Sequence, residues 1–134
     1  MADVNVSSGC ISTRDDAQAF ADGWAEAWNR RDVEAVLAHF HGDVIFTSPT
    51  ALAVVGTARV LGKQALRDYW SAALKRITSL HFTVDRIAWD DHSRELAIVY
   101  RAVIDGSSRR VSENLTFDAS GLVTCAEVFH GVPT

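Results

Sequence analysis

The stretch RRVSENLTFDASGLVTCAEVFH, residues 109–130, reads as two β-strands joined by the turn sequence DASG. In the first of these segments Val111, Leu115 and Phe117 recur at every second position, which is the spacing of side chains on one face of a strand. Glu113 falls in the same row. The pattern therefore predicts a buried strand face that contains one carboxyl group.

Two segments upstream of this stretch alternate in the same way. The connections DDHS, DGSS and DASG are short and are rich in Asp, Ser and Gly, which form tight turns. Because strands joined by short turns are antiparallel neighbours, the sequence predicts an antiparallel meander. Its four strands are Leu80–Trp89, Glu95–Ile104, Arg109–Phe117 and Leu122–His130.

Helical periodicity dominates the chain before these strands. A first helix is predicted to begin after Ser12 and Thr13, each followed three residues later by Asp15 or Asp16, as in a capping box. Its apolar stripe comprises Ala17, Phe20, Ala21, Trp24, Ala27 and Trp28.

Two more helices follow. Asp32 is predicted to cap the second, which ends at Gly42, and the third begins at Lys63. Their buried positions are Val33, Val36, Leu37 and Phe40 in the second helix, and Leu66, Tyr69, Trp70, Ala73, Leu74 and Ile77 in the third. Three helices before a strand meander predict an α+β domain whose helices cover one face of the sheet.

The segment between the second and third helices is less regular. Residues 43–48 read as a short strand, with Val44, Phe46 and Ser48 on one side and Pro49 closing it. Residues 50–62 lack a clean period and contain two glycines, so a loop with a possible short strand is predicted there.

Composition limits the possible functions. A chain of 134 residues suits one domain, here 14–134 after a lead-in of residues 1–13. A formal net charge of -4 argues against a nucleic-acid partner, and no apolar run approaches the roughly 18 residues that a membrane helix needs. Two cysteines far apart and no signal-peptide pattern favour a cytoplasmic protein without disulfides.

Three segments carry a resemblance to a known family: WAEAWNRRDVEAVLAHFHGDVIFTSP, GKQALRDYW and ENLTFDASGLVTCAEVFHG. Together they resemble the NTF2-like superfamily, in its SnoaL-like and ketosteroid-isomerase-like branch. The resemblance covers about residues 14–131 and implies a cone, in which a curved antiparallel sheet wraps round three helices and leaves an apolar cavity. It also implies a homodimer that pairs through the outer face of the sheet.

The resemblance assigns roles to several residues. Glu113 lies where ketosteroid isomerases carry a buried acid that donates a hydrogen bond to the developing oxyanion, and Trp24 lies where they carry a tyrosine. Ser48 stands where the general base is normally an Asp. The isomerase ending places His130 toward the cavity as a second catalytic candidate. The predicted ligand-binding residues are Trp24, Trp28, Phe46, Ser48, Trp70, Ile98, Tyr100, Leu115 and Val128.

Other interpretations of these residues stay open. Glu113 in an outward position would lie at a dimer interface or pair with Arg101 or Arg109, and His130 near the chain end suits an exposed edge. The tryptophans suit core packing as well as ligand contact. His39 and His41 are two positions apart, which does not favour a shared metal ion, and no metal is predicted.

The sequence therefore supports two functional hypotheses. In the first, the protein binds a small apolar molecule, such as a cyclic carbonyl or polyketide-like compound, and acts as an isomerase, cyclase or dehydratase without a cofactor. In the second, it is a non-catalytic homodimeric module for ligand binding or structure, which accounts for the missing Asp base. No GxSxG, GxGxxG, Walker or HExxH motif points to another chemistry.

Overall fold

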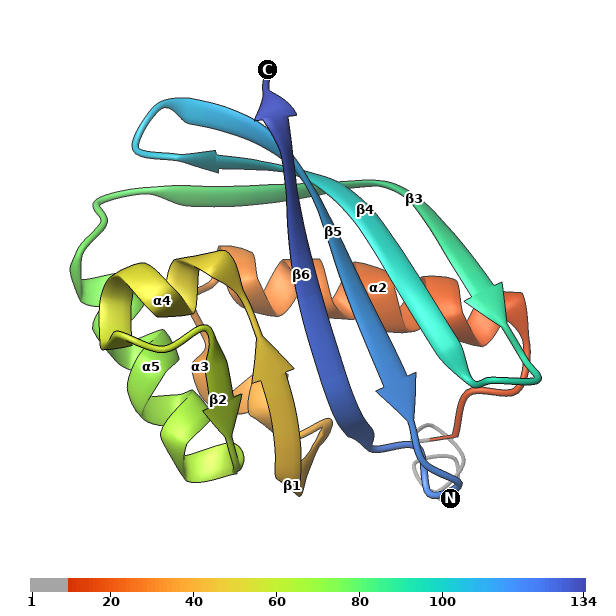
Figure 1. The fold of residues 1–134 in the computed structure, drawn as a ribbon. Coiled ribbons are helices and arrows are strands. Elements are labelled where there is room, and N and C mark those ends of the chain that lie inside the picture. Colours follow the sequence, from red (N-terminus) through yellow and green to blue (C-terminus); the bar gives the residue numbers. More distant parts are fainter. Residues whose placement is uncertain (1–9) are drawn as a thin grey trace.

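A six-stranded curved sheet wraps over one long helix in the computed structural model, which describes residues 10–134 (Figure 1). This arrangement confirms the predicted α+β class. The helices are α2 (Arg14–Asn29), α3 (Val33–Leu37), α4 (Pro49–Val55) and α5 (Lys63–Lys75). The strands are β1 (Phe40–Thr47), β2 (Arg59–Leu61), β3 (Leu80–Asp90), β4 (Glu95–Ile104), β5 (Ser107–Phe117) and β6 (Val123–Pro133).

The sheet has the strand order β2-β1-β6-β5-β4-β3. The meander from β3 to β6 is antiparallel, as predicted, but β1 and β6 pair in parallel. The prediction of a wholly antiparallel sheet is therefore corrected at one pairing. The reasoning from short turns applies only to consecutive strands, whereas β1 and β6 are joined through the whole middle of the chain.

Irregular pairing accounts for the curvature of the sheet. In β3 the register shifts between Val84 and Arg86, so Asp85 is an extra residue on that strand. A second shift separates Arg109 from Val111 in the pairing of β5 with β6. Bulges of this kind bend and twist a strand, which lets the long strands fold over α2 in Figure 1.

The first helix starts where the capping pattern predicts. The Thr13 side chain accepts a hydrogen bond from the Asp16 backbone N–H, and Asp16 accepts in return from the Thr13 N–H. At the other end Asn29 forms two hydrogen bonds with the Phe82 backbone, at 2.7 and 3.0 Å. These bonds dock the end of α2 against β3, so the apolar helix face is held against the sheet.

The second helix is shorter than predicted. It ends at Leu37, and Phe40 begins β1 instead of lying on a helix that reaches Gly42. Phe40 is 1% exposed, so it is buried as predicted but from a strand. Its spacing from Val36 suits a helix and its spacing from Val44 suits a strand, so the local pattern could not decide between the two.

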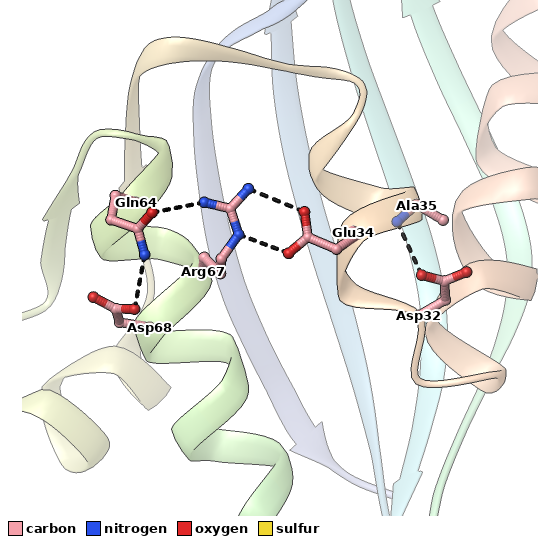
Figure 2. A network of polar contacts seen from close by, with 6 residues as sticks. All are labelled: Asp32, Glu34, Ala35, Gln64, Arg67 and Asp68. Carbon is pink, nitrogen blue, oxygen red and sulfur yellow. Dashed lines mark hydrogen bonds and ion pairs between the residues drawn. The ribbon is translucent and has the colours of Figure 1, made fainter.

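An ion pair ties α3 to α5 (Figure 2). Two nitrogens of Arg67 donate to the Glu34 carboxylate at 2.6 and 3.0 Å, and Arg67 also donates to Gln64. Arg67 lowers the pKa of Glu34. Because Glu34 is exposed and Arg67 is partly exposed, the effect of the pair on stability is small, and its bidentate geometry mainly fixes how the two helices face each other.

The prediction of a loop after Pro49 is wrong for its first part. Ser48 caps the short helix α4, and Gly56 ends it with a φ of 82°. The possible short strand exists as β2. The helical period was hidden because α4 buries only Ala51, while the apolar side chains of Leu52 and Val55 are 57% and 44% exposed.

Candidate functional site

A cavity of about 490 Å³ lies between the inner face of the sheet and the helices α4 and α5. Its wall is mainly apolar and comes from every strand of the sheet except β2, together with Trp28 of α2. The apolar stripe of α5 continues into this wall through Ala73 and Leu74, which are only partly buried. Ile77, predicted on the same helix, also lines the cavity but lies just after the helix, which ends at Lys75. Of the predicted site residues, the cavity is lined by Trp28, Phe46, Ser48, Trp70, Tyr100, Glu113, Val128 and His130.

Glu113 points inward from the middle of β5. It lies opposite Ile98 of β4 and Val128 of β6 and is 5% exposed. The alternative of an outward Glu113 paired with Arg101 or Arg109 is therefore wrong. Burial in this apolar setting disfavours the carboxylate and raises the pKa of Glu113 to about 7. Both the neutral and the charged form of Glu113 are consequently populated near neutral pH.

Tyr100 is the hydrogen-bond partner of this acid. Its hydroxyl donates to Oε1 of Glu113 at 3.3 Å, which opposes part of the rise in the pKa of the acid. Burial and the adjacent Glu113 raise the pKa of Tyr100 well above its ordinary value. The phenol therefore stays protonated and remains a donor. The ring of Trp24 packs edge-on against Tyr100, with the ring centroids 4.9 Å apart.

Tyr69 of α5 is a second phenol on the cavity wall and was not among the predicted site residues. Burial raises its pKa to about 12, and Glu113 contributes to the rise, while hydrogen bonding with Ser48 and Thr50 opposes it. A charge on Glu113 thus acts on Tyr69 across the cavity. The sequence placed Tyr69 on the buried stripe of its helix, but nothing local distinguished it from the core residues beside it.

Ser48 occupies the position where the resemblance implies a general base, and its side chain caps a helix there. Its Oγ accepts a hydrogen bond from the Thr50 N–H at 3.2 Å, which caps α4. The side chain is nearly fully buried on the cavity wall. A serine hydroxyl without a carboxylate or imidazole partner does not remove a proton from carbon near neutral pH.

His130 lies at the solvent-exposed part of the cavity wall, opposite Val111 of β5. Its Nδ1 contacts a guanidinium nitrogen of Arg109 at 3.2 Å, and its Nε2 contacts Oγ1 of Thr50 at 3.5 Å. Because arginine only donates, Nδ1 is the acceptor and Nε2 carries the proton. Burial and the charge of Arg109 lower the pKa of His130, which favours the neutral ring.

Three predicted ligand-binding residues lie beside the cavity rather than on its wall. Ile98, opposite Glu113, and Leu115, two residues along β5 from it, are fully buried in the core at 0% exposure. Trp24 stacks on Phe82, with the ring centroids 5.6 Å apart. These residues shape the wall indirectly, so their assignment as ligand contacts is corrected to core packing.

Metal-binding chemistry finds no support in the described part of the chain. Among residues 10–134, no three His, Cys, Asp or Glu side chains gather closely enough to hold a metal ion. His39 packs edge-on against Phe20 instead, with the ring centroids 5.1 Å apart. Cys10 and Cys125 are both exposed thiols.

Comparison with known proteins shows which family the chain belongs to. A family model described as a SnoaL-like domain matches residues 21–127. The chain belongs to this SnoaL-like family. A search of the curated proteins found no match to the sequence.

Several solved structures have a fold similar to that of this SnoaL-like chain. A SnoaL-like protein of unknown function from Burkholderia thailandensis E264 is 29% identical, with a TM-score of 0.80 over 90% of this chain and 98% of that one. The epoxide hydrolase/cyclase-like enzyme SalBIII, described in pyran ring formation in the polyether salinomycin, is 14% identical, with a TM-score of 0.71 over 91% and 95% of the two chains. TerC, co-crystallised with polyporic acid, is also 14% identical, with a TM-score of 0.71 over 86% and 92%. At such identities the last two show the fold alone.

Two expectations concern where this SnoaL-like protein acts and how it assembles. No helix among residues 10–134 is long and apolar enough to span a bilayer. The cytoplasmic location stays a prediction, as does the dimer through the outer face of the sheet. Phe129 is 53% exposed on that face of β6.

Proposed function

We propose that this SnoaL-like protein binds a small cyclic carbonyl compound in the cavity and that Glu113 transfers a proton at the carbon next to the carbonyl. The observation that carries the proposal is a buried carboxyl group with a pKa of about 7 on the wall of an apolar cavity. Acids and bases whose pKa values lie near the working pH are the most effective in proton transfer. Burial disfavours the charged form of a carboxyl group, so the placement of Glu113 does not stabilise the fold and is not explained by a structural role.

The proposed step uses groups already on the cavity wall. The Glu113 carboxylate takes the proton, so a C–H bond breaks and an O–H bond forms, and the electron pair moves to the carbonyl oxygen as an enolate. Tyr69 is protonated well above neutral pH and is the proposed donor to the enolate oxygen. Tyr100 keeps its hydrogen bond to Glu113. Return of the proton to the same carbon gives exchange, and return to another carbon completes an isomerisation. In a cyclisation the enolate carbon attacks a second carbonyl group of the ligand, and the alkoxide formed takes the proton back from Glu113.

Proteins with this fold give the proposal further support. SalBIII is described as an epoxide hydrolase/cyclase-like enzyme in the formation of a pyran ring, and TerC was co-crystallised with polyporic acid. No cofactor is needed for proton transfer between carbon and a carboxylate, so none is proposed here.

The non-catalytic module remains the second candidate function. The observation in its favour is Ser48, whose oxygen caps α4 where the resemblance implies an Asp base. In this alternative the cavity binds its ligand and releases it unchanged. The two functions differ in one measurable respect, which is whether a bound carbon acid exchanges its protons.

Hydrogen–deuterium exchange of a bound ketone tests the proposal. The bicyclic ketone 2-tetralone is incubated with the protein in D₂O near pD 7.5, and loss of its α-proton signals is followed by NMR. We expect exchange roughly 100-fold faster than with an equal concentration of free acetate, because a positioned base contributes at least that factor. Binding of 2-tetralone without faster exchange would instead support the non-catalytic module, and absence of binding would contradict both.

Replacing Tyr69 by Phe tests the role of the second phenol. We expect Tyr69→Phe to slow the exchange by on the order of 100-fold without moving the pH midpoint, because the variant loses an oxyanion donor and leaves Glu113 in place. Tyr100→Phe is the matched control, since Tyr100 contacts the acid itself. This control should raise the midpoint, because its hydrogen bond lowers the pKa of Glu113. If the two variants changed the exchange rate and the pH midpoint in the same way, the proposal that Tyr69 binds the oxyanion and Tyr100 binds the acid would be refuted.

A further inference from the structure

Positive charge gathers on the wall of a cavity in a protein of formal net charge -4. Arg76 and Arg109 both line the cavity and are exposed, so they lie at its solvent-facing mouth. Glu113 is the acidic side chain on this wall within residues 10–134, and it is buried in the interior. The positively charged mouth attracts anions, although the molecule as a whole is negatively charged.

Arg109 is held in place without being neutralised. It donates to Nδ1 of His130, whose Nε2 faces Thr50, so a neutral imidazole orients the guanidinium. In the part of the chain that the structure describes, Arg109 forms no ion pair with a carboxylate. Its full charge and its remaining N–H donors are therefore available to a ligand.

Its neighbour Arg110 shows the contrasting arrangement. Alternation along β5 turns Arg110 to the opposite face of the sheet, where it forms an ion pair of 2.6 Å with Asp85. Two adjacent arginines thus differ in one respect: the outward side chain has an acidic partner, and the inward one has none among residues 10–134.

Arg76 adds a second guanidinium to the mouth. It follows α5 and donates to the carbonyl oxygens of Ala53 and Val54 at 3.5 and 3.3 Å. These bonds satisfy the end of α4 and fix the side chain there, but they do not cancel its charge. The hydroxyl-bearing residues Ser107 and Ser108 line the same cavity.

We propose that the ligand of this cavity carries a carboxylate on an apolar ring system, with the carboxylate bound by Arg109 at the mouth and assisted by Arg76. The inference rests on the proposed function, to which it adds the substrate class. A guanidinium binds a carboxylate through two parallel hydrogen bonds, which makes arginine the suitable residue at this position.

The spacing along β5 gives the length of the ligand. Arg109 and Glu113 lie in the same inward row and are four residues apart, which corresponds to about 13 Å along a strand. A carbonyl carbon at Glu113 and a carboxylate at Arg109 thus fit a molecule of two or three fused rings. This arrangement also keeps the ligand's negative charge away from the acid that must accept a proton.

Calorimetric titration with two matched compounds tests the inference. At pH 7.5, 2-naphthoate carries the carboxylate, and 2-naphthamide has nearly the same shape without the charge. We expect 2-naphthoate to bind the wild-type protein about 10-fold more tightly than 2-naphthamide, because only the carboxylate can form a charge-assisted bidentate contact with Arg109. Arg109→Gln should remove this preference, and Arg109→Lys should keep part of it, because lysine retains the charge and loses the fork.

Arg110→Gln is the matched control, since it removes the adjacent charge from the outer face and should leave the preference unchanged. Equal affinities of the two compounds for the wild-type protein would overturn the inference, as would a preference that survives Arg109→Gln. If neither compound binds, both the inference and the cavity's proposed role fail. A preference for 2-naphthoate without α-proton exchange of 2-tetralone would support the inference and refute only the proposed catalysis.

Discussion

The free energy of unfolding is expected to fall by on the order of 3 kcal/mol between about pH 4.5 and pH 8 because of Glu113 alone. The pKa of this carboxyl group rises from 4.5 to about 7 on burial. Between these two values the folded state holds a proton that the unfolded state has released, so folding becomes less favourable as the pH increases. Each pKa unit corresponds to about 1.36 kcal/mol, which gives the stated magnitude.

Urea unfolding of the wild type and Glu113→Gln between pH 5 and pH 8 measures this effect. The Gln oxygen can still accept the hydrogen bond from Tyr100, but the side chain does not ionise, so the variant should lack the decline. His39 and His130 have lowered pKa values, so their contribution to stability rises with pH; both proteins contain them, and the difference between the two curves isolates Glu113. Parallel curves would show that Glu113 titrates normally in the folded protein.

Exchange of the α-protons of 2-tetralone is expected to slow by roughly 100-fold or more in Glu113→Gln, because the variant loses the only group proposed to accept the proton. In the wild type the rate should rise as the pH increases through about 7, where Glu113 becomes a carboxylate. The amide of the variant does not ionise, so the increase in exchange rate near pH 7 should be absent from its pH profile.

The control for this experiment is Glu127→Gln on the adjacent strand. Glu127 is exposed on β6, between the buried residues Ala126 and Val128, and does not line the cavity. Its substitution should leave both the exchange rate and the pH profile unchanged. Exchange that persists in Glu113→Gln with an unaltered profile would remove Glu113 from the mechanism and direct attention to another group on the wall.

The sequence predicted the elements whose signals are local. The capping residues Thr13 and Asp16 located the start of α2, and alternation with a period of two located the four strands of the meander. The same alternation placed Glu113 in one row with Val111, Leu115 and Phe117, because each residue of a strand points to the side opposite its neighbours, and the structure shows that this row is buried. These features depend only on backbone geometry over a few residues, so the order of residue types was sufficient.

Other features of the site depend on residues far apart in the chain. Tyr69 of α5 faces Glu113 of β5, and Arg109 meets His130, only because the helices and the bent sheet enclose a common space. A helical stripe reports that one face is covered, but not whether the covering leaves a cavity.

What the sequence by itself determined about this protein is the class of fold and the presence of one carboxyl group in an apolar row of a strand, while the structure decided that this acid points inward. The tertiary structure decided that α4 and the parallel pairing of β1 with β6 complete the cone, that the space inside stays open, and that the acid there has a pKa of about 7. The physical reason is that periodicity follows from local backbone geometry, whereas cavity volume and desolvation depend on how distant elements pack together.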